Sequence, residues 1–199
     1  MDARFVMLRP KRVSDQEKWL IYQNSGGGQR NIELLDPNIT ACPECEDLLE
    51  QLADSKAWVN FSQGVDVRLI TERKAELLKR IKVRLVHFAW DRYEDKDLIV
   101  PKLEMISEIT GWDRHKVSVY VLTNFDTTLE QDLERIYTIR DFGFSPYVMV
   151  YDKEHTTMAY TCRQLQRWVN NPYIFRSTER FEEYYPMKRA RSEHGSGKD

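Results

Sequence analysis

The residue types best suited to chemistry in this sequence stand directly after short apolar segments. The largest such group surrounds Gly64, where Gln63, Asp66 and Arg68 follow an apolar segment that begins at Trp58. Polar residues follow four other apolar segments in the same way: Asp36 and Asn38, Asp91, Asn124, and Tyr151. The competing interpretation is that Asp and Asn form turns and cap helices. The cluster around Gly64 carries more polar groups than a turn requires, so it is the stronger candidate for a binding site.

The segments that precede these residues read as β-strands that alternate with helices. The expected strands are Asn31–Asp36, Trp58–Gln63, Val83–Trp90, Lys116–Leu122 and Pro146–Tyr151. Between them we expect helices over Pro43–Ala53, from Thr71 to about Ile81, over Leu98–Ile109, and from Thr128 to near Gly143, with a last helix over Arg163–Val169. This alternation is typical of parallel β/α units. It predicts a barrel or part of one, and an open doubly wound sheet is the competing architecture.

In this architecture the polar residues would lie at the same edge of the sheet. In parallel β/α folds, binding sites form at the carboxyl ends of the strands. We therefore expect the residues that follow the five strands to meet along one rim. The chain divides into an N-terminal helix and loop (1–30), a partial β/α barrel (31–160), a C-terminal helical segment (161–187) and a disordered tail (188–199).

The three cysteines do not predict a metal site. Cys42 and Cys45 form a C-x-x-C pair, but a zinc site needs about four ligands. The remaining cysteine is Cys162, and the four histidines are scattered. We interpret the pair as thiols in the first turn of a helix, with a redox-active pair as the alternative.

Composition excludes several classes of protein. The chain has 199 residues and a net charge of -2, which gives no strong signal for nucleic acid. Trp168 and the aromatic residues around Phe181–Tyr185 are expected to dock a terminal helix rather than to stack on bases. No apolar run approaches the roughly 20 residues of a membrane helix. The odd number of cysteines does not suit a disulfide framework, so we expect a cytoplasmic protein.

Five blocks of the sequence, within roughly residues 10–185, resemble a subfamily of the radical S-adenosylmethionine (radical SAM) proteins. The blocks are Asn31–Ile39, Val59–Thr71, Lys82–Asp95, Val117–Ile136 and Arg167–Phe175. The resemblance implies a partial barrel of six β/α units. The chain provides five strands of such a barrel, so we expect the first strand to be missing. A missing strand would expose a sheet edge at Asn31–Asp36 or its neighbour, and favours pairing with an N-terminal fragment or self-association.

The resemblance also implies a cofactor. Radical SAM proteins bind a [4Fe–4S] cluster through a C-x-x-x-C-x-x-C motif and use it to cleave SAM to a 5′-deoxyadenosyl radical. This sequence has no such motif, which predicts a truncated member that holds no cofactor and is inactive by itself. The substrate stays unknown. By resemblance, Gln63, Asp66, Arg68 and Asn124 would bind the cofactor, whereas the substrate pocket would contain Asp36, Asn38, Asp91 and Tyr151.

Two other functions are compatible with the same residues. The polar rim could belong to a non-catalytic module that binds a nucleotide or a protein. Alternatively, Asp36, Asp66 and Asp91 could hold a divalent metal ion in an independent β/α enzyme, because carboxylates at strand ends suit Mg²⁺.

Overall fold

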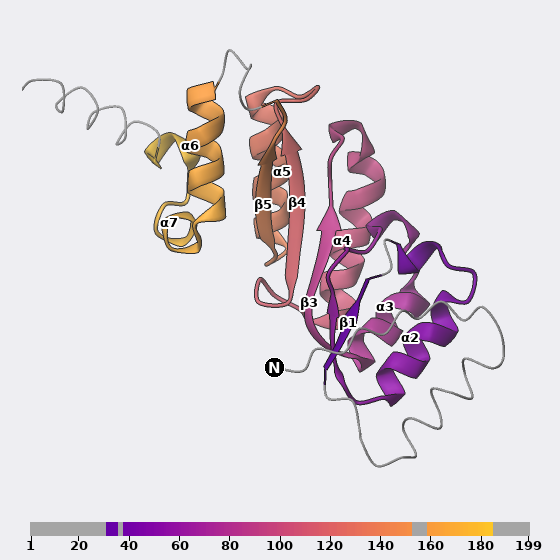
Figure 1. The fold of residues 1–199 in the computed structure, drawn as a ribbon. Helices are drawn as coiled ribbons and strands as arrows, with labels where there is room; N and C mark the ends of the chain where they lie inside the picture. The colour runs from indigo at the N-terminus through magenta and orange to yellow at the C-terminus, as the bar shows by residue number, and fades with distance from the viewer. Residues whose placement is uncertain (1–30, 36–37, 153–158, 185–199) are drawn as a thin grey trace, which may run out of the picture.

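A parallel β-sheet forms the centre of the molecule (Figure 1). The computed structural model describes residues 31–35, 38–152 and 159–184. Within these ranges the sheet has five strands in the order β1-β2-β3-β4-β5, and every neighbouring pair is parallel. Their bounds are β1 Asn31–Leu34, β2 Trp58–Phe61, β3 Lys82–Ala89, β4 Val117–Thr123 and β5 Ser145–Val150. All five expected strands are confirmed, although β1 and β2 each end two residues early.

The strand order decides between the two expected architectures. Consecutive strands are neighbours throughout, and right-handed crossovers then place the connecting helices on one face of the sheet. Strand β4 shows the result, because Val117, Val119 and Val121 are buried whereas Ser118 and Tyr120 on the other face are partly exposed. The doubly wound alternative, with helices on both faces, is therefore wrong. The described sheet is an open, partial β/α fold and does not close into a barrel.

Local capping signals fix several helix ends. The helices are α2 Cys45–Asp54, α3 Glu72–Arg80, α4 Lys96–Thr110, α5 Leu129–Asp141, α6 Ala159–Asn170 and α7 Pro172–Ser177. Thr71 caps α3 by accepting a hydrogen bond from the backbone N–H of Lys74 at 3.2 Å. Thr128 and Gln131 form the expected capping box at α5. Helix α4 ends at Gly111, whose φ of 64° suits a glycine. Pro43, expected inside α2, lies in the turn that precedes it.

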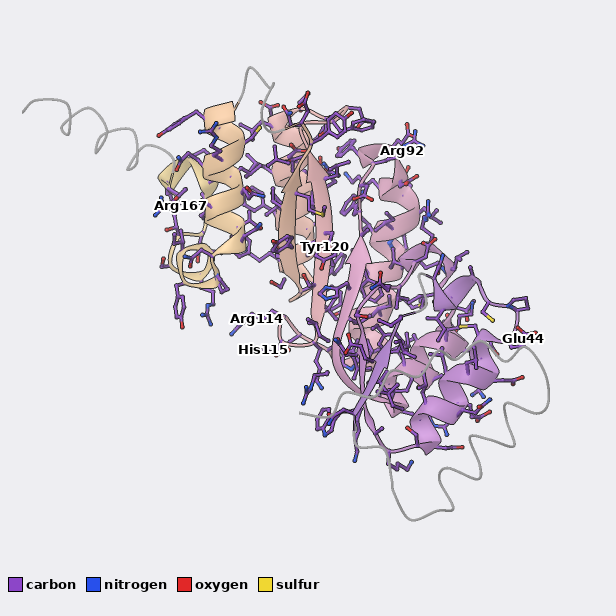
Figure 2. All side chains as sticks on the ribbon, viewed as in Figure 1. Glu44, Arg92, Arg114, His115, Tyr120 and Arg167 are labelled. Carbon is purple, nitrogen blue, oxygen red and sulfur yellow. The ribbon has the colours of Figure 1, made fainter. Side chains whose placement is uncertain are left out.

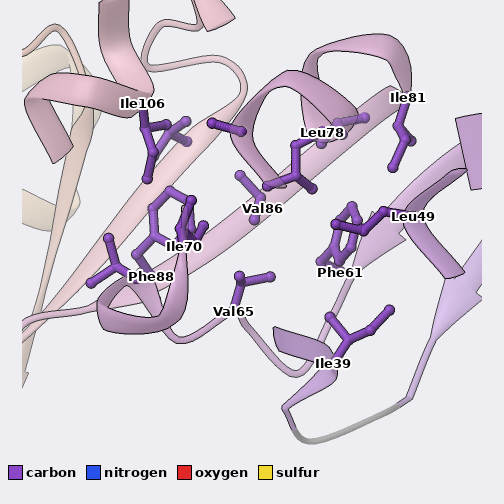
Figure 3. Packing of buried hydrophobic residues seen from close by; sticks show 14 of the residues in the cluster. Ile39, Leu49, Phe61, Val65, Ile70, Leu78, Ile81, Val86, Phe88 and Ile106 are labelled. Atoms are coloured by element: carbon purple, nitrogen blue, oxygen red, sulfur yellow. The ribbon is translucent and has the colours of Figure 1, made fainter. Parts of the chain in front are cut away.

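The main hydrophobic core lies between the sheet and helices α2, α3 and α4. Figure 3 shows how Phe61, Val86 and Phe88 of the sheet face Leu49 and Leu78 of the helices. Burial of each such side chain contributes roughly 1.5–3 kcal/mol. This core holds the strands in register, and it thereby fixes the loops that follow them.

A second apolar cluster docks the C-terminal helices. Trp168 of α6 is completely buried, and its ring centroid lies 4.8 Å from that of Phe175 and 5.5 Å from that of Phe181. Its indole N–H donates to the carbonyl of Thr178 at 3.1 Å. The expected docking role of Trp168 is confirmed, and α6 is longer than the sequence predicted.

Helix α6 also caps one edge of the sheet. The side-chain oxygen of Asn170 accepts from the N–H of Val148 at 2.8 Å, and its amide donates to the carbonyl of the same residue at 3.0 Å. Asn170 thus replaces a neighbouring strand along part of β5, which protects an edge prone to pairing with other chains. Among the described strands, β1 forms the opposite edge.

Parts of the expected organisation lie outside the described residues: the N-terminal helix and loop (1–30), Asp36 and the tail (188–199). None of the helices in the described part of the chain combines the length and apolar character that a membrane crossing requires.

Candidate functional site

A cavity of about 310 Å³ opens at the carboxyl ends of β2 and β3. It gathers five of the residues that the sequence singled out: Asn38, Gln63, Asp66, Arg68 and Asp91. Four further polar or aromatic residues line it that sequence reasoning did not select: His87, Arg92, Asp95 and Tyr120. Figure 2 labels Arg92 at this end of the sheet and Tyr120 near its middle. We call this cavity the rim cavity.

A tight turn at Gly64 places the loop after β2 over β3. Gly64 has a φ of 88°, which L side chains rarely adopt. A Cβ atom there would lie 3.3 Å from the carbonyl oxygen of His87, and the next N–H, that of Val65, donates to this oxygen at 2.8 Å. The turn therefore brings Gln63 and Asp66 to the cavity from either side of Gly64.

Asp66 is held by Arg68 rather than left free for a ligand. Its two carboxylate oxygens each accept a hydrogen bond from the Arg68 guanidinium at 2.9 Å, and one also accepts from the Arg68 backbone N–H at 3.1 Å. These bonds from Arg68 lower the pKa of the Asp66 carboxyl below its usual value. The Arg68 side chain stays half exposed, with one nitrogen 4.0 Å from Asp95. We infer that Asp66 orients Arg68 in the lining of the cavity.

The buried guanidinium of Arg135 holds the backbone at Asp91. The fully buried Arg135 of α5 donates to the carbonyls of Trp90 and Asp91 at 2.7 and 2.8 Å, and to that of Leu122 at 2.8 Å. It also forms an ion pair of 2.6 Å with Asp132. Partial desolvation raises the pKa of the Asp91 carboxyl, while the nearby charges of Arg135 and Arg68 oppose the rise.

An aromatic pair forms one wall of the rim cavity. The rings of His87 and Tyr120 stack with centroids 5.0 Å apart and planes 14° from parallel. Burial lowers the pKa of His87, so its imidazole is neutral at pH 7. Both residues lie in mid-strand and face away from the helices. Strand alternation was the available signal, since Val86 and Phe88 on either side of His87 are buried.

Two of the predicted residues lie apart from the cavity. Asn124, with a φ of 61°, follows β4, and its amide donates to the carbonyl of Tyr151 at 2.9 Å. The Tyr151 ring makes an edge contact with Phe125 at 4.8 Å between centroids. Neither Asn124 nor Tyr151 lines the rim cavity. Asp36 is not among the described residues, so the structure does not place it.

The three thiols lie in two separate parts of the fold. The Cys42 thiol donates to a carboxylate oxygen of Glu44 at 3.1 Å. Cys45 is buried in the core, where desolvation raises its thiol pKa, which argues against a redox-active pair. Cys162 lies in α6, which packs against β5 at the far side of the sheet. Across the described ranges, no three His, Cys, Asp or Glu side chains gather as metal ligands.

The lining of the rim cavity combines charged, polar and aromatic groups. It offers a guanidinium, a carboxylate, a neutral imidazole and the Tyr120 ring, which together suit a ligand that bears both charges. Comparison of the chain with family models, curated proteins and solved structures gave no match.

Proposed function

We propose that the chain is a β/α module of the radical SAM type that binds an S-adenosyl ligand in the rim cavity. The observation that carries the proposal is the convergence of Asn38, Gln63, Arg68 and Asp91 on one cavity at the strand ends. These residues belong to blocks that resemble the radical SAM subfamily. The parallel sheet with its helices on one face is compatible with part of such a barrel.

The chemistry of the cavity supports the ligand class. SAM carries a carboxylate, a cationic amine and sulfonium, a ribose diol and an adenine ring. Arg68 suits the carboxylate because a guanidinium binds carboxylates through paired N–H donors. The Asp91 carboxylate suits either the amine or the diol. The exposed part of the His87–Tyr120 stack offers a surface for a flat heterocycle.

The positions of the cysteines support the proposal that the chain binds SAM without cleaving it. A [4Fe–4S] cluster needs closely spaced thiolates, and Cys162 lies too far along the fold from Cys42 and Cys45 to complete a set of three. No reaction step through a cluster is therefore derived for these residues. In the proposal, any cluster comes from another polypeptide segment, which could pair with the β1 edge.

The His87–Tyr120 stack equally suits a second candidate, a non-catalytic module that binds other adenine nucleotides. The divalent-metal alternative has less support, because Asp66 uses both carboxylate oxygens to bind Arg68. An exposed Arg–carboxylate pair would have to open before that carboxylate could bind a cation.

Isothermal titration calorimetry of the purified chain without iron tests the proposal. We expect S-adenosylhomocysteine and SAM to bind, and Asp91→Asn and Arg68→Gln each to weaken binding by about tenfold, the typical effect of one charge-assisted hydrogen bond. Asp54→Asn, on the exposed face of α2, is the matched control and should bind as the parent does. Absence of heat with both ligands would refute the proposal. Binding of AMP that Asp91→Asn weakens, without binding of SAM or S-adenosylhomocysteine, would favour the second candidate.

Anaerobic reconstitution with iron and sulfide tests the part that concerns the cluster. We expect no stoichiometric [4Fe–4S] absorption and no 5′-deoxyadenosine from SAM. A full cluster that cleaves SAM would show that the three thiols suffice after all.

A further inference from the structure

A second cavity, of about 410 Å³, lies at the opposite end of the sheet from the rim cavity. It is bounded by the loop before β4, the turn between α5 and β5, and helices α6 and α7. Its charged and polar lining residues are Arg114, His115, Arg140, Ser145, Arg176 and Glu179. Figure 2 labels Arg114 and His115 at this end, far from Arg92 at the other. We call it the basic cavity.

We propose that the basic cavity binds the phosphate group of a small phosphorylated molecule. Three arginines from separate elements line it, and Glu179 is the one carboxylate in its lining. In the described part of the chain, no carboxylate lies within 4.0 Å of the guanidinium nitrogens of these three arginines, although the charges of Asp141 and Glu179 act on Arg140. One carboxylate does not balance the charge of three guanidiniums, whose paired N–H donors match phosphate oxygens.

An aromatic ring and two backbone carbonyls hold the guanidinium of Arg140 in position. Its guanidinium carbon lies 3.7 Å from the centroid of the Phe175 ring, and it donates to the carbonyls of Phe175 and Glu179. Arg176 is likewise oriented by a 2.8 Å bond from its Nε to the carbonyl of Pro172. Burial lowers the pKa of Arg140, while the nearby charges of Asp141 and Glu179 oppose the fall.

Two observations favour a small ligand over a nucleic acid. The chain has a net charge of -2, so no extended positive field attracts a polyanion. The cavity also has the volume of a small-molecule site, which runs from about 300 to 1,000 Å³. The Ser145 hydroxyl and the apolar surface of Val169 and Pro172 can contact the organic part of the ligand.

This inference does not depend on the proposed function. Calorimetry at low ionic strength would compare inorganic phosphate, ribose 5-phosphate and AMP, with adenosine as the probe that lacks phosphate. We expect the three phosphates to bind and adenosine not to compete, with affinity falling as salt rises. Inorganic phosphate binding alone would identify the ligand as the free ion, whereas tighter binding of an ester supports the small-molecule proposal.

Substitutions on exposed positions locate the binding. Arg114→Gln and Arg176→Gln should each weaken phosphate binding by about tenfold, and Glu179→Gln should strengthen it a few-fold. Arg167→Gln, an exposed arginine of α6 outside the cavity, is the matched control. Each of these side chains is exposed, so the variants should fold. Binding that Arg114→Gln and Arg176→Gln leave unchanged, or no binding by any phosphate up to millimolar concentration, would overturn the proposal.

Discussion

Replacing Arg135 with methionine would test how the fold holds the rim. Arg135 is fully buried and donates to three backbone carbonyls and to Asp132. Methionine fills a similar volume but donates no hydrogen bond, so these carbonyls lose a donor and the Asp132 carboxylate becomes an unpaired buried charge. Removing one partner of a buried ion pair costs about 3–5 kcal/mol. Domain stabilities are about 5–15 kcal/mol, so the loss is a large share of the total.

Urea unfolding followed by circular dichroism measures this change. We expect the free energy of unfolding of Arg135→Met to fall by about 3–5 kcal/mol and the melting temperature to fall on the order of 10 °C. Much of the cost should come from the orphaned carboxylate, so Asp132→Asn in the same chain should recover part of the loss. Arg114→Met, at an exposed position, is the matched control and should change stability little.

The pH dependence gives an independent check. Burial raises the pKa of Asp132 even with Arg135 present, and removing Arg135 removes two interactions that oppose the rise. In a pH range where the unfolded chain is still ionised, a folded carboxyl with a raised pKa already binds a proton. The loss of stability caused by Arg135→Met should therefore shrink as the pH falls toward 4. If Arg135→Met lowered the free energy of unfolding by less than about 1 kcal/mol at pH 7, the view that Arg135 holds the ends of β3 and β4 together would be refuted.

Three further changes test other parts of the structure. Asn170→Ala should uncover the N–H of Val148, whose carbonyl keeps the amide of Gln166 as a donor. It should lower stability by about 1–3 kcal/mol and promote association, measured by urea unfolding and analytical ultracentrifugation; a stable monomer would contradict the edge-capping role. Gly64→Ala should cost about 1–2 kcal/mol because of its left-handed φ, and unchanged thermal stability would show that the turn can rearrange. His87 has a lowered pKa, so its contribution to stability is complete above about pH 6.5 and is lost as the pH falls through the folded value. His87→Gln should flatten this part of the pH–stability curve, and an unaltered curve would exclude His87 as its source.

Local sequence signals were sufficient for the elements of the fold. The strands were predictable because β-branched and aromatic residues alternate with half-exposed ones, and the caps at Thr71, Thr128 and Gly111 act within a single turn. The same signals placed Gln63, Arg68 and Asp91 at strand ends, where a parallel sheet brings them to one rim. Each of these inferences needs only residues close together in the chain.

Contacts between distant segments decided what those residues can do. Arg135 reaches the ends of β3 and β4 because α5 packs against β4 and against the turn that follows β3, and no pattern around position 135 indicates this. The pairing of His87 with Tyr120 depends on the register between two strands. Arg114 and Arg176 share a cavity because α7 folds back beside the loop before β4. The sequence alone determined the parallel β/α architecture and its polar rim, because periodicity and capping are local. Packing in three dimensions decided which side chains meet and which are already bound to other groups of the protein.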